Sequence, residues 1–408
     1  MTGAVVAIFV ATYLGMALGR VPGLALDRSG MAVVAAIACV AIGALAPGHV
    51  LEAIHFPTLI LLFALMIVSA RFAAAGAYDW LAARIAASAG SPTRLLVLTT
   101  AIAGGLSAVL VNDVVVFVMT PLLVRGLMLR GLDPRPFLAA LAGAANAGSA
   151  ATLIGNPQNI VIGQVGGLDF LGFARVCAPP AIAALLLTVV VVRLVWARAL
   201  ATPPRGPAPG LPPVDRAQCL KAGLATALLL GLFLTPVPRE FSAIAVAGVL
   251  LTSRRFASRD MLAAVDWPLL LLFAGLFVVN HALAETGLTR QGLAWLAQQG
   301  FGFEALRVML PAALIASNTI GNVPAVIMLL AAEPGFAPGV LQALALTTTL
   351  AGNFFLVGSI ANLIVAERAR REGVEFGFAA HARAGVPLTL ATLALAALWL
   401  IATGRAAW

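Results

Sequence analysis

Apolar stretches long enough to cross a lipid bilayer recur along the whole chain. A helix needs about 20 mostly apolar residues to span a hydrocarbon core about 30 Å thick, whereas the strands of a membrane barrel alternate apolar and polar positions. The pattern here is continuous rather than alternating. It predicts an all-α polytopic membrane protein with about ten transmembrane helices, at residues 3–19, 30–46, 57–75, 137–166, 171–195, 220–234, 241–252, 267–285, 340–366 and 385–403.

Two further apolar stretches, 94–129 and 305–332, are interrupted in the middle by polar residues. We interpret each as a re-entrant hairpin, which enters and leaves the membrane on the same side. Two complete spans remain the alternative, because they also return the chain to its starting side. Polar residues midway along 137–166 and 340–366 predict two broken helices. Short amphipathic helices at 78–89 and 288–299 are expected to lie at the membrane interface.

The chain contains an internal repeat, with three motifs in the same order and spacing in each half. The first half has IHFPTLILLF at 54–63, SAVLVND at 107–113 and LIGNPQNIV at 153–161; the second has VDWPLLLLF at 265–273, SNTIGNV at 317–323 and LVGSIANLI at 356–364. An odd number of predicted crossings separates Pro57 from Pro268, so the second repeat should be inverted. A stiff, proline-rich segment at 201–216, expected in the cytoplasm, separates the halves 1–200 and 217–408.

Composition agrees with a membrane protein and excludes several other classes. The chain is 62% hydrophobic and 10% charged, with a mean hydropathy of +1.03, whereas soluble domains average roughly 25% charged residues. The net charge of +9 does not indicate nucleic-acid binding, because the basic residues are spread over loops. Cys39, Cys177 and Cys219 share no spacing motif, so neither a disulfide framework nor a metal site is predicted. The first apolar stretch lacks the flanks of a signal peptide and is interpreted as a span.

The distribution of basic residues predicts the orientation in the membrane. When the spans are followed in order, most of the 25 lysine and arginine residues, beginning with Arg20 and Arg28, fall on one side. The other side receives only Arg175, Arg239, Arg290, Arg307 and Arg405. Because loops rich in lysine and arginine stay in the cytoplasm, we expect a protein of a bacterial-type inner membrane with both termini outside the cytoplasm.

The first predicted hairpin carries a carboxylate at membrane depth. Ser107, Asn112 and Asp113 interrupt an otherwise apolar stretch, and an ionised aspartate there costs roughly 2.5–3.5 kcal/mol on insertion scales. Such a residue is tolerated when it faces a cavity, a cation or a proton. Asp113 is therefore the candidate group for proton or cation coupling. The alternative is that Asn112 and Asp113 only cap the second arm of the hairpin.

The first broken helix is interrupted by the sequence Gly-Asn-Pro-Gln-Asn at 155–159. Asn156 suits an N-cap and Pro157 suits the first position of a helix, so the chain should unwind near Gly155 and restart. Free carbonyls of one half-helix coordinate a cation, and free N–H groups of the next attract an anion. A simple packing kink is the alternative, but it would not need the further amides of Gln158 and Asn159.

The second half carries interruptions at the matching positions. Its hairpin contains Ser317, Asn318, Thr319 and Asn322, and its broken helix contains Gly358, Ser359 and Asn362. Ser359 and Ile360 stand where the first half has Asn156 and Pro157, so the site should be asymmetric. Hairpin turns or kinks alone would explain each interruption singly, but less readily the symmetric set.

Other polar residues suggest helix packing rather than catalysis. Asn146, Asn353 and the threonines at 347–349 precede the breaks, and they either line the site or bond between helices. Asn280 and His281, near a helix end, are expected either to form interhelical hydrogen bonds or to lie at the membrane interface. The chain has no histidine pair with metal spacing and no Walker A, HExxH or GxSxG motif. Neither an ATP-driven pump nor an enzyme is therefore predicted.

These motifs resemble the ion transporter superfamily, which includes divalent anion:sodium symporters, citrate-transporter-like permeases and arsenite-efflux permeases. The resemblance covers nearly the whole chain and is most specific in VNDVVVFVMTP at 111–121, IGNPQNIVIG at 154–163, SNTIGNVP at 317–324 and VGSIANLIV at 357–365. It implies that the hairpin tips and broken-helix loops enclose the substrate and coupling ions. It also implies a homodimer in the lipid bilayer, with an elevator-like motion of the hairpin domain.

Carried over position by position, the resemblance implies two clusters of binding residues. The first is Ser107, Asn112, Asp113, Gly155, Asn156, Pro157 and Asn159, and the second is Ser317, Asn318, Thr319, Asn322, Gly358, Ser359 and Asn362. A sodium ion, the one cofactor implied, would bind near Asn112, Asn159, Asn322 or Asn362. Dicarboxylate symporters carry Ser-Asn-Thr in both hairpins, but here only the second hairpin does. Asn112-Asp113 followed by Thr120-Pro121 looks more like the arsenite-efflux branch, which favours proton coupling or a single cation site.

The leading functional hypothesis is a secondary active transporter for a small anion, coupled to sodium or protons. The substrate would be an organic di- or tricarboxylate or an inorganic oxyanion. Efflux of arsenite or antimonite and sodium/proton exchange are alternatives within the superfamily, and a passive channel is the alternative from another class. No basic residue lies within the four motifs, so an anion would depend on helix ends, amides and bound cations. Alanine at Asn159 or Asn362 should abolish uptake without unfolding the protein.

Overall fold

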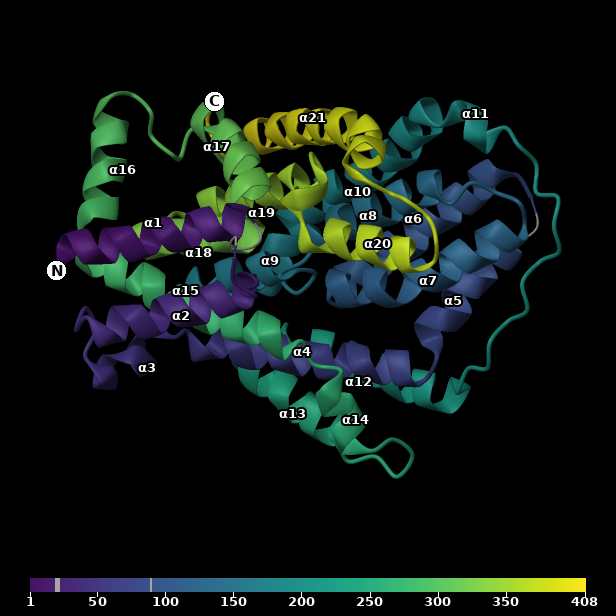
Figure 1. The fold of residues 1–408 in the computed structure, drawn as a ribbon, viewed down its shortest axis with the longest axis horizontal. Helices are drawn as coiled ribbons and strands as arrows, with labels where there is room; N and C mark the ends of the chain where they lie inside the picture. Colours follow the sequence, from purple (N-terminus) through teal and green to yellow (C-terminus); the bar gives the residue numbers. More distant parts are fainter. Residues whose placement is uncertain (19–22, 89) are drawn as a thin grey trace.

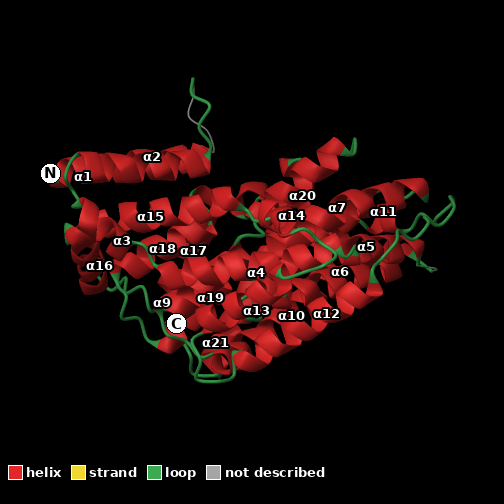
Figure 2. Ribbon diagram, turned by 90° about the horizontal axis from the view of Figure 1, so that it is seen from below, coloured by secondary structure: helices red, strands yellow, loops and turns green. Residues whose placement is uncertain are grey.

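Helices make up all the regular structure in the part of the chain that the computed structural model describes, residues 1–18, 23–88 and 90–408 (Figure 2). The first half contains α1 (Thr2–Leu18), α2 (Arg28–Ala41), α3 (Val50–Ala53), α4 (Phe56–Ala74), α5 (Ala77–Ala87), α6 (Pro92–Val109), α7 (Asn112–Leu129), α8 (Arg135–Ser149), α9 (Pro157–Val165), α10 (Phe170–Val195) and α11 (Ala197–Leu200). The second contains α12 (Arg216–Leu232), α13 (Arg239–Leu251), α14 (Ser258–Ala263), α15 (Trp267–Glu285), α16 (Leu288–Gln298), α17 (Leu306–Thr319), α18 (Asn322–Ala332), α19 (Pro338–Ala351), α20 (Ile360–Arg371) and α21 (Phe378–Ala402).

The predicted all-helical membrane fold is confirmed. Six helices of the described chain, α4, α6, α7, α10, α15 and α21, are long and apolar enough to cross a membrane. The predicted broken spans appear as the pairs α8–α9 and α19–α20, and the predicted interfacial helices appear as α5 and α16. The last residue of the predicted span 3–19, the last residue of the predicted helix 78–89, and Arg20 lie outside the described residues.

The two halves repeat the same series of helices. The paired helices α4 and α15 both have 19 residues, α5 and α16 both have 11, and α10 and α21 have 26 and 25. The chain turns sharply into α5 at Gly76 and into α16 at Gly287. Both glycines have left-handed backbone conformations, with φ of 76° and 73°, which glycine adopts without steric cost. Figure 1 places α5, α6 and α7 at one end of the molecule and α16, α17 and α18 at the other, as inversion requires.

Each half packs against the other rather than forming a separate body. Helix α2 packs on α15, and its counterpart α13 packs on α4; likewise α7 packs on α20 and α18 packs on α9. The proline-rich segment 201–215 is also hydrogen-bonded to the first half. The N–H groups of Arg205 and Gly206 donate to the Arg130 carbonyl, and the Asp215 N–H donates to the Ala75 carbonyl. The expected solvated linker therefore follows the protein surface.

The tips of the predicted hairpins at 94–129 and 305–332 reach the interior. Because α6 and α7 are each long and apolar enough to cross a membrane, the choice between a re-entrant hairpin and two complete spans stays a prediction. The tip between α6 and α7 contacts the loop that joins α8 to α9: the Asn112 N–H donates to the Gly155 carbonyl at 3.1 Å, and the Thr152 hydroxyl donates to the Ala108 carbonyl at 2.5 Å. The tip between α17 and α18 contacts the other broken loop, where the Phe355 N–H donates to Asn318 Oδ1 at 3.0 Å. Both tips therefore meet a broken helix.

Close backbone contacts around the breaks require glycine. A Cβ atom on Gly155 would collide with the Ser149 carbonyl, and one on Gly358 would collide with Asn318 Oδ1. These glycines directly precede the N-cap residues Asn156 and Ser359. The sequence therefore lets the hairpin tips and broken loops approach each other closely at both ends of the repeat.

Candidate substrate and ion site

Two buried asparagines brace the broken-helix loops in the same way. Asn159 Nδ2 donates to the carbonyls of Ser149 and Thr152, 10 and 7 residues earlier, at 3.2 and 3.0 Å. Asn362 Nδ2 donates to the two carbonyls at the same intervals before it, at 2.8 and 3.3 Å. Both side chains are fully buried. The shared register makes the two loops equivalent parts of the repeat, and it commits these amide nitrogens to holding the loop backbone.

Four helices restart around these breaks, α7 at Asn112, α9 at Pro157, α18 at Asn322 and α20 at Ile360. Asn156 caps α9, because its Oδ1 accepts a hydrogen bond from the Asn159 N–H at 2.9 Å. The other three helices have no side-chain cap. The first N–H groups of a helix have no partner within it, and its N-terminus carries about half a positive charge. Apart from the Asn112 N–H, which donates to the Gly155 carbonyl, several backbone donors are thus available around the breaks.

Asn146 connects these restarts from α8, a helix that is buried from Pro136 to its end. Its Nδ2 donates to Asn353 Oδ1 at 2.8 Å and to Asn362 Oδ1 at 3.1 Å. Its Oδ1 accepts from the Ser359 hydroxyl at 3.0 Å and from Asn112 Nδ2 at 3.4 Å. Asn146 and Asn353 therefore form hydrogen bonds that join different helices, which is one of the two roles that the sequence left open for them. Asn280 likewise forms an interhelical bond, to the Tyr13 hydroxyl, which is one of the two roles expected for it.

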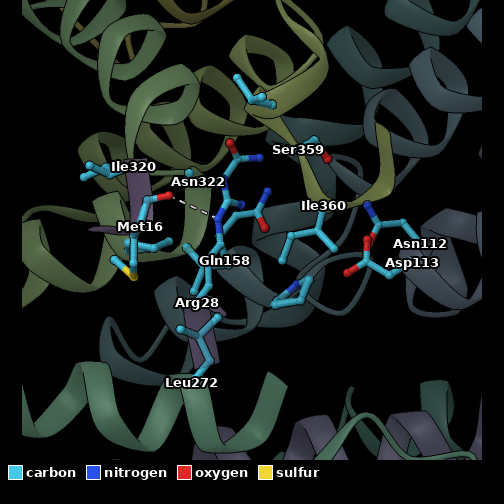
Figure 3. Close-up of a pocket in the computed structure, with 16 residues that line it drawn as sticks. Met16, Arg28, Asn112, Asp113, Gln158, Leu272, Ile320, Asn322, Ser359 and Ile360 are labelled. Atoms are coloured by element: carbon cyan, nitrogen blue, oxygen red, sulfur yellow. Dashed lines mark hydrogen bonds between the residues drawn. The ribbon is translucent and has the colours of Figure 1, made fainter. Parts of the chain in front are cut away.

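The restarted helices surround a cavity of about 40 Å³ (Figure 3). Six of the predicted site residues line it: Asn112, Asp113, Pro157, Asn322, Gly358 and Ser359. One water requires roughly 10–15 Å³, so in this conformation the cavity has room for a small ion or a few waters. It is too small for a tricarboxylate.

Unpartnered polar atoms face this region from both hairpins. Asn112 Oδ1 and Asn322 Oδ1 have no hydrogen-bond partner in the described chain, although the two side chains are only 3% and 8% exposed. Buried polar groups are nearly always hydrogen-bonded, so orphaned oxygens at equivalent hairpin positions indicate a ligand. An amide oxygen is a suitable ligand for a hard cation such as sodium.

Asp113 is the carboxylate of the cavity, and it also lines a second cavity of about 420 Å³. That second cavity is bounded by α4, α7, α14, α15 and α20, and Asp266 lies on its wall. Asp266 caps α15 by accepting from the Leu269 N–H at 3.0 Å. Asp113 is therefore accessible from two cavities, and no ion pair within the described residues engages it.

The remaining predicted residues do not line the cavity: Ser107, Gly155, Asn156, Asn159, Ser317, Asn318, Thr319 and Asn362. Most are buried supports behind the wall. Ser317 donates to the Thr348 carbonyl at 3.3 Å, and Asn318 Nδ2 donates to the Ala351 carbonyl at 2.9 Å. Thr319 is exposed, and its hydroxyl donates back to the Ile315 carbonyl of its own helix. Their functional roles remain predictions.

Two lining residues with polar side chains, Gln158 and Arg28, were not among the predicted site residues. Gln158, which is 5% exposed, donates from Nε2 to the Thr349 hydroxyl at 3.2 Å. Arg28 was assigned to a cytoplasmic loop, but it lines the cavity, and its Nε donates to the Met16 carbonyl at 3.2 Å. A sequence signal for Arg28 existed in the repeat: Arg28 and Arg239 stand at the same interval before Pro57 and Pro268.

In the described residues, no group of three histidine, cysteine, aspartate or glutamate side chains could hold a metal ion. A sodium ion would instead depend on amide and backbone oxygens and on Asp113. Taken together, the cavity offers helix N-termini and a guanidinium to an anion, and one carboxyl group and two amide oxygens to a cation or proton.

Three comparisons with known proteins agree on the class of protein. Residues 13–351 match the model of a family described as citrate transporter. An uncharacterized transporter of Mycobacterium tuberculosis is 29% identical over 97% of both chains. The silicon efflux transporter LSI3 of Oryza sativa subsp. japonica is 26% identical over 92% of both chains. The fold is similar to the crystal structure of the Alcanivorax borkumensis YdaH transporter, with a TM-score of 0.60, 18% identity, and coverage of 99% of this chain and 98% of that one.

Proposed function

Because the chain belongs to the citrate transporter family, we propose that this membrane transporter is a secondary active transporter that moves a small anion across the inner membrane, driven by sodium or protons. The substrate would be a carboxylate or an inorganic oxyanion bound at the cavity between the hairpin tips and broken helices. The proposal assigns no enzymatic step to the protein.

The observation that carries the proposal is the convergence of four helix N-termini, those of α7, α9, α18 and α20, on one cavity. Such ends attract anions because their free N–H groups point outward and the helix dipole adds positive charge. Interrupted helices at equivalent places in inverted repeats commonly form the substrate site of secondary transporters. Three of the four ends lack a side-chain cap. The Asn112 N–H of α7 donates to the Gly155 carbonyl, so the donors proposed for a ligand are the other free N–H groups in these first turns.

Coupling is assigned to Asp113 and the amide oxygens of Asn112 and Asn322. Asp113 lines two cavities, and a carboxylate at membrane depth is costly unless it binds a proton or a cation. A proton or sodium ion on Asp113 would cancel its repulsion of the anion. Binding of the driving ion and of the substrate would therefore favour each other.

The walls of the cavity support an elevator-type motion. Hairpins and broken helices form one side, whereas Met16, Arg28 and Leu272 come from α1, α2 and α15. We propose that the first group moves against the second and carries the bound ions across. The same proposal includes a homodimer, which the family resemblance implies. It also places both chain termini outside the cytoplasm, as the distribution of basic residues predicts.

A second candidate function is efflux of a neutral oxyacid. It is favoured by the small volume of the cavity and by the similarity to a silicon efflux transporter. In that case the helix ends would bind hydroxyl oxygens and Asp113 would exchange a proton.

Uptake into proteoliposomes under imposed gradients tests the proposal. Purified protein would be assayed with sulfate, phosphate, succinate and citrate, and with arsenious acid as the neutral oxyacid. Accumulation of an anion that requires an inward sodium or proton gradient is expected. Transport of arsenious acid alone would favour the second candidate, and flux that neither gradient affects would indicate a channel.

A further inference from the structure

We propose that Arg28 is the charge-selecting residue of the site, and that the substrate presents an oxyanion group, either carboxylate or inorganic, to its guanidinium. The inference rests on the proposed function, because it assigns the same cavity a specific ligand for the anion. Figure 3 shows the Arg28 side chain entering the cavity beside Gln158 and Asn322, with Asn112 and Asp113 at the other end.

The guanidinium is held at one edge and free at the other. Its Nε donates to the Met16 carbonyl at 3.2 Å, and its two terminal amino groups have no hydrogen-bond or ion-pair partner among the described residues. A guanidinium presents paired N–H donors that match the two oxygens of a carboxylate or oxyanion. An arginine anchored through Nε therefore leaves its anion-binding edge available to a ligand in the cavity.

The nearby acidic groups do not neutralise Arg28. Asp27 caps α2, with its side chain accepting from the Gly30 N–H at 2.7 Å. Asp113 shares the cavity, but it forms no ion pair with Arg28. A partly buried cation with no counter-ion is costly, and a bound anion would remove that cost.

The position of Arg28 also explains how one cavity can hold both an anion and a driving cation. Arg28 lies at one end and Asp113 at the other. The unpartnered Oδ1 atoms of the deeply buried Asn112 and Asn322 add acceptors for a cation. The anion would then lie against Arg28 and the helix ends, and the proton or cation would lie at Asp113.

The repeat supplies a matched control in Arg239. Arg28 and Arg239 are the first residues of the equivalent helices α2 and α13. Arg239 also donates to a backbone carbonyl, that of Gly163, at 2.9 Å, but it does not line the central cavity. A substitution at Arg239 therefore removes the same side chain from the same place in the other repeat.

The test uses full-length protein in proteoliposomes and the four-anion panel. For any anion that the wild type transports, Arg28→Gln should raise the half-saturation concentration at least tenfold. Arg28→Lys should have a smaller effect, and Arg239→Gln should leave the value within about twofold. An unchanged value in Arg28→Gln would overturn the inference and leave the proposed function intact. A wild type that transports arsenious acid but none of the anions would overturn both.

The variant Arg28→His tests the role of charge through the pH dependence of half-saturation. A purely structural role of Arg28 would not produce such a dependence. In Arg28→His, sulfate retains its charge across the assay range while the imidazole loses its proton as the pH rises. The half-saturation ratio of this variant to wild type should therefore grow between pH 5.5 and 8, roughly the range in which histidine titrates. Taking the ratio cancels the pH dependence contributed by Asp113. A flat ratio, or the same slope in Arg239→His, would contradict the inference even if Arg28→Gln failed to fold.

Discussion

Replacement of Asn146 by alanine removes the side chain that joins the two broken helices. Its side chain is 1% exposed and makes three hydrogen bonds of 2.8 to 3.1 Å, to Asn353, Asn362 and Ser359. A typical hydrogen bond contributes a net of about 1 kcal/mol, and a buried group left without a partner costs about 1–3 kcal/mol. Asn146→Ala should therefore lower the free energy of unfolding by at least about 3 kcal/mol.

The same change should affect substrate binding, because two of the partners of Asn146 are part of the cavity wall. Ser359 and Asn112 both bond to Asn146 Oδ1 and both line the cavity. Without that acceptor, the Ser359 hydroxyl and the Asn112 amide lose their fixed orientation. The half-saturation concentration for the transported anion should rise at least tenfold.

Asn280→Ala is the control, since Asn280 is 2% exposed and bonds to the Tyr13 hydroxyl and the Leu276 carbonyl, and its side chain neither lines the cavity nor bonds to the broken loops. Thermal unfolding of purified protein and uptake into proteoliposomes should be measured for both variants. Asn280→Ala should lower the melting temperature but leave half-saturation within twofold of wild type. The reasoning would be refuted if Asn146→Ala melted like wild type, or if both variants shifted half-saturation equally.

Three further predictions address coupling, helix packing and an ion pair at the protein surface. Asp113→Asn should abolish gradient-driven accumulation of the anion while exchange of labelled for unlabelled anion persists; accumulation at the wild-type level would rule out Asp113 as the coupling group. Gly148→Ala should lower the melting temperature, because its Cβ would collide with the Gly104 backbone between α6 and α8, whereas Gly105→Ala, with open space around it, should not. Arg125 donates to both carboxylate oxygens of Glu372 and holds the pKa of that carboxyl below its usual range. This ion pair stabilises the fold, by about 1 kcal/mol or less, above the pKa of the unfolded carboxyl, and its contribution is lost as the pH falls through the lower folded pKa. Glu372→Gln should thus melt slightly below wild type at neutral pH, and the difference should vanish in acid; a difference that persists in acid would refute this assignment.

The helix breaks could be predicted from sequence because their chemistry is local. A helix cannot continue through Gly155-Asn156-Pro157, and the observed restart of α9 at Pro157 with Asn156 as its cap follows from these residues alone. The match between Asn159 and Asn362 was also visible as a repeat. In contrast, the network at Asn146 depends on bringing together α8, the loop after α19 and the start of α20, and no local sequence pattern predicts that these segments meet.

Arg28 shows the limit of counting charges along the chain. A basic residue at the end of an apolar stretch usually lies in a loop, and the rule that assigns loops to a side of the membrane depends on that assumption. In the folded chain, α1 and α2 pack against α15. The end of α1 and the start of α2 reach the cavity, where Met16 and Arg28 form part of its wall. The repeat identifies Arg239 as its equivalent, but only the packing determines which of the two faces the cavity.

The most direct test of the central claim asks whether a transported anion occupies the cavity between the hairpins. Val357 lines that cavity and is 40% exposed, whereas Leu211, which is 44% exposed, lies in the proline-rich surface segment. Each would be changed to cysteine in protein lacking Cys39, Cys177 and Cys219, and the rate of modification by an uncharged maleimide would be measured. A saturating concentration of the anion should slow modification at Val357→Cys and not at Leu211→Cys. Equal rates at Val357→Cys with and without the anion would contradict the placement of the substrate in this cavity.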